Sequence, residues 1–220
     1  MKSAFSLVVS LLFVAASQAQ VRSITADEYK GNFNGAVYAT NAAFPFIFTV
    51  KTESFENGKL VRSESKVDER ESEGNERIKK VFIINGKKTD VFQITAGLGN
   101  FYCSDDGVSW KPLSRHWCPG PDKILNLYSE RTSGNAEYSV EQKSLEGKEV
   151  KVYRRYSVFA PSKPNGKKEY QEKVSTIDSG GFLIDLTTTE GTLDPKIITR
   201  VQTESWDTTT KFKPVVAPIK

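Results

Sequence analysis

The side chains best suited to chemistry lie together in residues 101–118, FYCSDDGVSWKPLSRHWC, which hold Cys103, Cys118 and the single histidine, His116. A Ser-His-Asp triad could use only His116, and the neighbouring serines lie in no G-x-S-x-G context. A zinc site built from these three residues lacks the paired C-x-x-C or H-x-x-x-H spacing. We therefore predict no catalytic residue and no metal ligand here, and a protein that is not an enzyme.

The two cysteines instead favour a disulfide, because the chain begins like a secreted protein. Lys2 precedes an apolar run over residues 4–16, and small residues occupy Ser17 and Ala19. This pattern is typical of a signal peptide, and the run is too short to span a bilayer. We expect a signal peptide over residues 1–19, cleavage near Ala19, and a secreted or periplasmic product. We expect a single domain over residues 20–220, with Cys103 bonded to Cys118.

Other kinds of site receive little support. Acidic residues are plentiful, but no two stand out as a glycosidase-like pair. Asp105-Asp106-Gly107 resembles a fragment of a calcium loop without its remaining ligands, so a hairpin turn is the simpler interpretation. No phosphate-binding glycine loop is present, and we expect no cofactor. Basic and acidic residues alternate, as in EGNERIKK, at a net charge of +4. This mixing argues against a nucleic-acid partner, and no segment beyond the signal peptide indicates a transmembrane helix.

The elements that position these residues begin with a predicted helix over residues 25–42. Thr25 is a suitable N-cap, and Glu28 three residues later completes a capping-box pattern. Tyr29, Phe33 and Val37 recur at helical spacing, with Tyr38 at the margin of the same face. Gly31 and Gly35 weaken the helix by about 1 kcal/mol each relative to alanine. A second, short helix is expected over residues 122–131, DKILNLYSER.

From Pro45 onward the pattern changes to the period of two that is typical of strands. Six dipeptides supply turns between such runs: Asn57-Gly58, Asn85-Gly86, Asp106-Gly107, Glu146-Gly147, Asn165-Gly166 and Gly180-Gly181. Tyr102 and Trp110 are expected to be partners across the third turn. The last strand is expected over residues 196–206. The sequence therefore predicts a mainly β fold, an antiparallel meander of hairpins.

Aromatic residues are abundant for a chain with so little predicted helix: 13 Phe, 8 Tyr and 3 Trp. A curved sheet could enclose an apolar cavity with these side chains, or the helices could fill it completely. Periodicity reveals burial but not voids, so both possibilities remain open.

Several segments resemble the LolA/LppX-like group of bacterial envelope proteins, and most closely a secreted branch of it. They are ADEYKGNFNGAVYAT followed by PFIFTVKTESFENGKLV, then IKKVFIING, FYCSDDGVSWKP, YSVEQKSLEGKEVKVYRRYSV, VSTIDSGGFLIDLTTTEGTLDPKIITRVQTESWD and KFKPVVAPIK. The resemblance covers nearly the whole chain after the signal peptide. One departure is Asp185, which interrupts an apolar run after Phe182. The resemblance implies a strongly curved antiparallel half-barrel with both helices against its concave side, and carriage of lipids or lipoprotein acyl chains.

Together these expectations describe a binding protein that shelters a lipid or acyl chain in a half-barrel. Face alternation gives the candidate lining residues: Phe46, Phe48, Val50, Phe82, Ile84, Val152 and Phe182. The alternative is an envelope module with a filled core that binds another protein, in the manner of a chaperone, and takes no small ligand. An exposed apolar patch on the rim of the sheet would favour this alternative.

Overall fold

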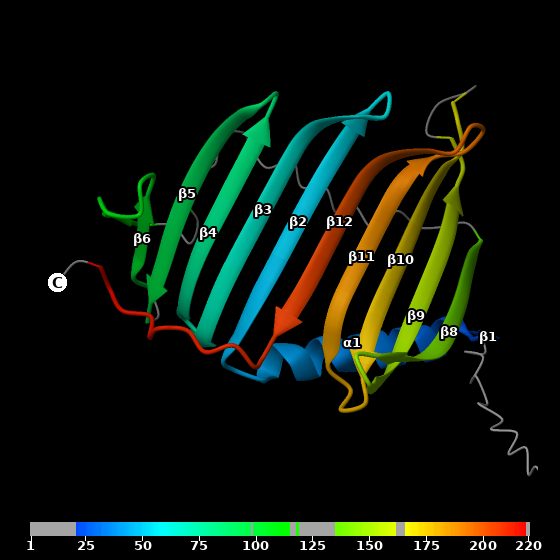
Figure 1. Ribbon diagram of the computed structural model, residues 1–220, viewed down its shortest axis with the longest axis horizontal. Coiled ribbons are helices and arrows are strands. Elements are labelled where there is room, and N and C mark those ends of the chain that lie inside the picture. The colour runs from blue at the N-terminus through cyan, green and yellow to red at the C-terminus, as the bar shows by residue number, and fades with distance from the viewer. Residues whose placement is uncertain (1–20, 98, 115–117, 119–134, 162–165, 219–220) are drawn as a thin grey trace, which may run out of the picture.

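The computed structural model describes residues 21–97, 99–114, 118, 135–161 and 166–218. Within these residues the chain forms one helix and twelve strands (Figure 1). Their bounds are β1 Arg22–Ser23, α1 Ala26–Ala42, β2 Phe46–Glu56, β3 Lys59–Ser72, β4 Asn75–Ile84, β5 Lys87–Ala96, β6 Phe101–Ser104, β7 Lys111–Leu113, β8 Ala136–Leu145, β9 Lys148–Phe159, β10 Glu169–Asp178, β11 Leu183–Thr192 and β12 Ile197–Asp207. The expected signal peptide and the helix over residues 122–131 lie outside the described residues.

All twelve described strands belong to one antiparallel sheet, in the order β1-β8-β9-β10-β11-β12-β2-β3-β4-β5-β6-β7. The chain thus builds two meanders, β2 to β7 and β8 to β12. The last strand of the second meander pairs with the first strand of the other, with Trp206 opposite Phe48. Local turn signals predict several of the hairpins, but this long-range pairing of β12 with β2 has no signal in the sequence.

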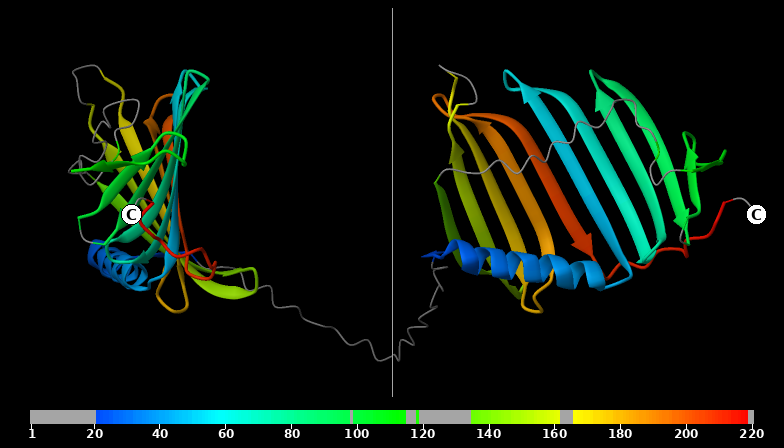
Figure 2. Two further views of the ribbon diagram at one scale, coloured as in Figure 1. Left: turned by 90° about the vertical axis from the view of Figure 1, so that its left-hand side faces the viewer. Right: turned by 180° about the vertical axis from the view of Figure 1, so that it is seen from behind.

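The sheet is curved and has two edges, and its ends bend toward the side on which α1 lies (Figure 2). The fold-class prediction is confirmed in this respect: the protein is mainly β, an open antiparallel half-barrel with its N-terminal helix on the concave side. We call the face that carries Tyr153, Trp206, Phe48 and Phe82 the inner face, because residues paired across antiparallel strands share a face. Tyr153 and Trp206 pack against α1 there.

Three of the predicted turns have the backbone that a two-residue hairpin requires, with both residues at positive φ. They are Asn57-Gly58, Asn85-Gly86 and Glu146-Gly147. Gly180-Gly181 also joins two strands, β10 and β11, whereas Asn165 lies outside the described residues. A turn that we did not predict, at Gly74, joins β3 to β4 with φ of 79°.

The hairpin at Asp106-Gly107 differs from the expectation. Here β6 and β7 are separated by a longer loop, and Tyr102 pairs with Pro112 rather than with Trp110. The physical reason is the Asp106 carboxylate, whose Oδ1 accepts hydrogen bonds from the backbone N–H groups of Val108 and Ser109, at 2.8 and 2.7 Å. Such an aspartate-centred turn replaces a two-residue hairpin turn. These bonds hold the pKa of Asp106 well below its usual range.

Helix α1 begins as the sequence predicts. The Thr25 hydroxyl accepts a hydrogen bond from the Glu28 N–H at 3.1 Å. The Glu28 carboxylate completes no capping box, because it pairs with Arg22 at 2.5 Å. Tyr29 is buried, while Tyr38, expected at the margin of the packed face, is 79% exposed and so does not belong to it.

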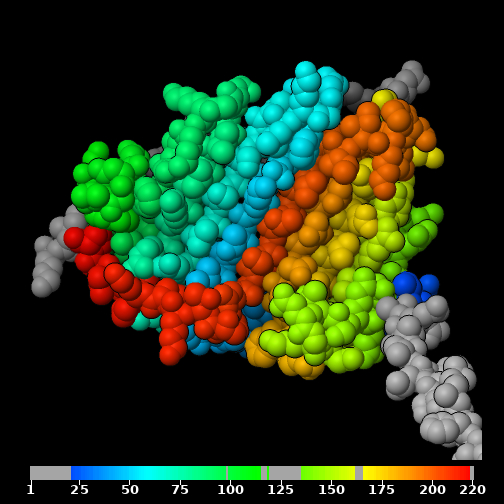
Figure 3. All heavy atoms as spheres, in the orientation of Figure 1, coloured from blue at the N-terminus to red at the C-terminus, as the bar shows by residue number. Residues whose placement is uncertain are grey.

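The C-terminal tail, residues 208–218, crosses the outer face along the lower ends of β2 to β5 (Figures 1 and 3). Arg77 Nη2 donates to the Pro214 carbonyl oxygen at 3.1 Å, and the Val215 N–H donates to Glu71 Oε2 at 3.0 Å. Val215 is buried. The tail is therefore a packed part of the fold and leaves the inner face to α1.

Candidate functional site

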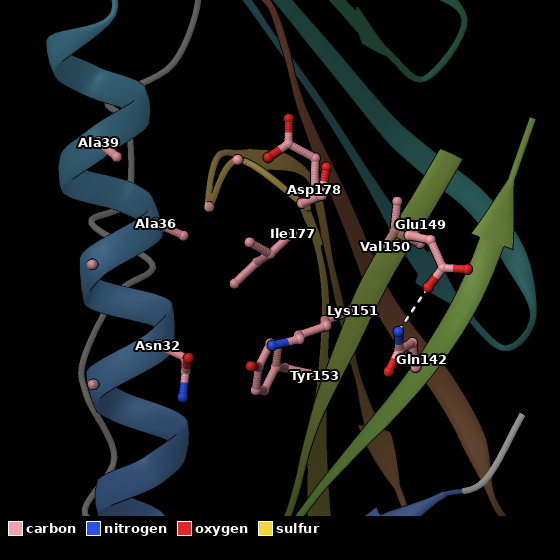
Figure 4. A pocket seen from close by; sticks show the side chains of 15 residues that line it. Asn32, Ala36, Ala39, Gln142, Glu149, Val150, Lys151, Tyr153, Ile177 and Asp178 are labelled. Carbon is pink, nitrogen blue, oxygen red and sulfur yellow. Dashed lines mark hydrogen bonds between the residues drawn. The ribbon is translucent and has the colours of Figure 1, made fainter. Parts of the chain in front are cut away.

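A groove of about 560 Å³ separates α1 from the lower ends of β8, β9 and β10 (Figure 4). Its volume is within the range of small-molecule sites. Its walls come from the helix, from the three strands and from the turn between β10 and β11. The lining residues are Gly31, Asn32, Gly35, Ala36, Ala39, Gln142, Glu149, Val150, Lys151, Tyr153, Ile177, Asp178, Ser179, Gly180 and Gly181.

The helix side of the groove exists because it carries small residues. Gly31, Gly35 and Ala39 are spaced four residues apart and therefore lie on one helical face. A Cβ atom added to Gly31 or to Gly35 would meet no atom within 4 Å. Each glycine thus leaves open space instead of allowing a close contact between helix and sheet. The sequence contained this signal, since two glycines inside a helix at this spacing have no value for helix stability.

The helix is held at this distance by contacts on either side of the groove. Thr40, which is 1% exposed, accepts a hydrogen bond from the Leu183 N–H at 2.7 Å and donates to the Ala36 carbonyl at 2.7 Å. At its other end, Tyr29 packs against Tyr138 and Tyr153, with ring centroids 5.2 and 6.5 Å apart. The groove lies between two fixed ends of α1.

The polar side chains at the groove are partly engaged. Gln142 Nε2 donates to Glu149 Oε2 at 2.7 Å, and Asp178 Oδ1 accepts from the Phe182 N–H at 2.8 Å. Lys151 and Tyr153 come from the same strand and extend toward the helix (Figure 4). The floor of the groove is therefore apolar at Ile177 and polar along β9.

The inner face has a different character on β3. Asp68, whose side chain is fully buried, lies between two cations on the same strand: its Oδ2 is 2.9 Å from both Lys66 Nζ and Arg70 Nε. Lys66 and Arg70 lie over the rings of Phe48 and Phe46, 5.7 Å from each centroid. Asp68 Oδ1 accepts no hydrogen bond within the described part of the chain.

This polar network extends to the disulfide. Arg70 is 3.7 Å from Glu76, and Glu76 Oε1 accepts from the Thr95 hydroxyl at 3.1 Å. Gln93 in turn accepts a hydrogen bond from the Cys118 N–H at 3.3 Å. Buried polar groups in a folded protein normally have such partners. The inner face of β3 to β5 is thus a hydrogen-bonded surface with apolar residues interspersed.

The Cys103–Cys118 disulfide is present, with its Cα atoms 5.7 Å apart. It packs against Phe82, Val91 and Leu113 in a second core cluster. His116 lies outside the described residues. Among the described residues, no three His, Cys, Asp or Glu side chains are placed to hold a metal ion.

Five of the seven candidate lining residues share the inner face, as their cross-strand partners show. Phe46, Phe48 and Val50 lie on β2, and their partners on β3 lead to Phe82 and Ile84 on β4. Phe46 and Phe82 are core residues, 1% and 2% exposed. None of the five lines the groove, and whether any of them touches a ligand stays a prediction.

The other two candidates lie elsewhere. Val152 precedes Tyr153 and pairs with Thr176, so it points to the outer face. The alternation of apolar and polar residues does not assign Val152 to a face, because β9 carries buried apolar residues on both faces, Val150 on one and Tyr153 on the other. Phe182 lies in the turn before β11 and is 36% exposed. Asp185 is also on the outer face, where Thr176 Oγ1 donates to it at 3.0 Å and burial raises its pKa.

No helix within the described residues has the length and apolar character needed to cross a membrane. No protein-family model matches the chain, and no curated protein sequence matches it.

Two solved structures follow a similar course. The crystal structure of LprF from Mycobacterium bovis is 10% identical with a TM-score of 0.44, covering 90% of this chain and 99% of that one. A putative outer membrane lipoprotein-sorting protein domain from Vibrio parahaemolyticus is 12% identical with a TM-score of 0.28, covering 86% of this chain and 95% of that one. The likeness concerns the fold and does not bear on a ligand.

Proposed function

We propose that this protein is a binding protein, without enzymatic activity, that shelters the apolar chain of a lipid or acyl group in the groove under α1. The observation that carries the proposal is the open space beside Gly31 and Gly35, within a groove of about 560 Å³. Each methylene group that leaves water contributes about 0.8 kcal/mol, so a chain lying along the glycines can bind without any covalent chemistry. The resemblance to envelope lipid carriers supports the same ligand class.

A place of action outside the cytoplasm belongs to the proposal. The Cys103–Cys118 disulfide supports it, because structural disulfides persist in oxidising compartments. Another envelope protein that delivers or receives the ligand is a further expectation.

Two substitutions at Gly35 test the proposal. Gly35→Leu places a branched side chain in the groove and is expected to weaken binding of 1-dodecanol at least tenfold. Gly35→Ala adds one methyl group, should stabilise the helix by about 1 kcal/mol, and should leave most of the groove open. Binding is measured by displacement of N-phenyl-1-naphthylamine fluorescence, and folding by circular dichroism.

Leucine and alanine both favour helices, so a loss of binding confined to Gly35→Leu reports the groove and not the helix. The proposal fails if the native chain binds no alcohol, or if Gly35→Leu binds it as tightly as the native chain does.

A further inference from the structure

The hydroxyl group of Tyr153 is the first of two unused donors in the groove. Tyr153 is 4% exposed, lines the groove, and has its side chain directed toward α1 (Figure 4). No hydrogen bond joins its hydroxyl to another residue in the described part of the chain, and the hydroxyl is not among the fully buried unpaired polar atoms, so it opens onto the groove. Burial raises the pKa of this phenol, so it keeps its proton at neutral pH and can donate it.

Lys151 supplies the second donor. It is two residues before Tyr153 on β9, so both side chains leave the strand on the same face. Its side chain is exposed and its ammonium group is directed toward the helix (Figure 4). A lysine ammonium carries three donors and no acceptor. The ammonium can only donate, and the protonated phenol beside it can donate as well.

The carboxylates near these donors already have partners. Glu28 pairs with Arg22, Glu149 accepts a hydrogen bond from Gln142, and Asp178 accepts one from the Phe182 N–H. The hydrogen bond from Arg22 lowers the pKa of Glu28 most, and the charge of Lys151 lowers it a little further without a direct ion pair. Lys151, which is exposed, and the Tyr153 hydroxyl are therefore both accessible to an acceptor from outside the chain.

We propose that Lys151 and Tyr153 bind the anionic head of a single-chain amphiphile, a carboxylate or a phosphate, whose chain lies along Gly31, Gly35 and Ile177. This inference rests on the proposed function and specifies its ligand. Hydrogen bonds between an ionised acceptor and a charged donor are about twice as strong as neutral ones, so the head selects among ligands with equal chains.

The experiment compares three ligands of one chain length: dodecanoate, dodecyl phosphate and 1-dodecanol. The native chain is expected to bind at least one of the two anions ten times more tightly than the alcohol. Lys151→Met and Tyr153→Phe should each remove most of that preference while affinity for the alcohol changes little. Lys151→Arg should retain the preference, and Lys148→Met, at an exposed position outside the groove, should leave it unchanged.

The outcomes separate the two proposals. Equal affinity for anions and alcohol, with binding still lost in Gly35→Leu, overturns the anionic head and leaves the groove as the binding site. A preference that survives Lys151→Met also overturns the inference. Failure of all three ligands to bind overturns both proposals. Binding of only one of the anions identifies the head as a carboxylate or as a phosphate.

Discussion

The inner face of this sheet is stabilised in two different ways on its two halves. Over β8 to β11 it is covered by α1, and the contacts are aromatic and aliphatic, centred on Tyr29, Ile177 and Leu183. Over β3 to β5 it carries the network of Lys66, Asp68 and Arg70, which links to the disulfide segment. The groove lies beside the apolar half.

The comparison indicates how one sheet can be rigid and still have room for a ligand. Apolar contacts are non-directional, so small residues on a helix can open a space without breaking a bond. A charged network is directional, and removing one member leaves its partners buried and unpaired. We therefore expect the β3 half to tolerate little change and the α1 half to accept changes of volume.

The largest expected effect follows from Asp68→Ala. It removes the one fully buried member of the network and leaves Lys66 and Arg70 without their common partner. Because both cations keep partial access to water, the free energy of unfolding should fall by about 3 kcal/mol, the lower end for breaking a buried pair. The control is Glu69→Ala, which removes a carboxylate from the next position, where it is 2.6 Å from Arg77 on the outer face. That partly exposed pair should be worth less than about 1 kcal/mol. Urea denaturation measures the free energy of unfolding of both variants. Equal losses in the two variants would contradict the expectation that the buried network on β3 tolerates little change.

A smaller effect is expected where α1 meets β11. Thr40→Val keeps the shape of the side chain but removes the oxygen that accepts the buried Leu183 N–H. An unpaired buried donor costs about 1–3 kcal/mol. Hydrogen exchange should show the loss first at the amides of α1. The control is Thr199→Val, where the hydroxyl donates to Glu190 in an exposed position. A loss at Thr199 as large as at Thr40 would show that the contact with the sheet is unimportant.

The smallest expected effect is a difference between the two halves in how their contribution to stability depends on pH. Burial raises the pKa of Tyr29, on the α1 half, to about 12 from 10.0. The unfolded chain therefore loses this proton first, and stability falls as pH rises from 10 toward 12, by about 1 kcal/mol at pH 11. Burial lowers the pKa of Lys80, on the β4 half, so the folded state releases that proton more easily and is relatively favoured as pH rises.

Tyr29→Phe should accordingly flatten the alkaline loss measured by urea denaturation between pH 9 and pH 11. Some loss of stability with rising pH should remain in this variant, because burial also raises the pKa of Tyr153 and of Tyr170. An unchanged slope in Tyr29→Phe would show that α1 is not the alkali-sensitive part.

Most of the fold follows from local signals in the sequence. Asn57-Gly58 and Asn85-Gly86 specify hairpins, and Thr25 marks the first turn of α1, because each acts through bonds to near neighbours. The pairing of β12 with β2 joins segments that are far apart in the sequence: Thr52 and Gln202, which share a hydrogen bond, are 150 residues apart. No local sequence pattern encodes such a pairing. Similarly, Asp106 directs a wider turn through its own side chain, which a dipeptide rule does not consider.

The site is harder to predict than the fold, because a groove forms where side chains leave space unfilled, and sequence patterns report only which side chains are buried. Alternation identifies side chains that leave water, and Phe46 and Phe82 do so, but complete burial in a core gives no room for a ligand. Gly31 and Gly35 lower helix stability when only the sequence is considered, and in the structure the same two residues form a wall of the groove. The polar character of β3 was visible as alternating charge, but its burial depends on pairing across strands.

The strand order has a practical consequence for measuring shape. Val21 directly precedes β1 at one edge of the sheet, and Val216 follows Val215, which bonds to Glu71 on β3 beyond the middle of the sheet. The two valines are 63% and 65% exposed. Dyes attached to cysteines introduced at these two positions allow the distance between them to be measured by resonance energy transfer. That distance depends on how strongly the sheet is curved. A ligand that increases the curvature of the half-barrel shortens the distance between the dyes and raises the transfer efficiency. One that merely fills the space under α1 leaves it unchanged.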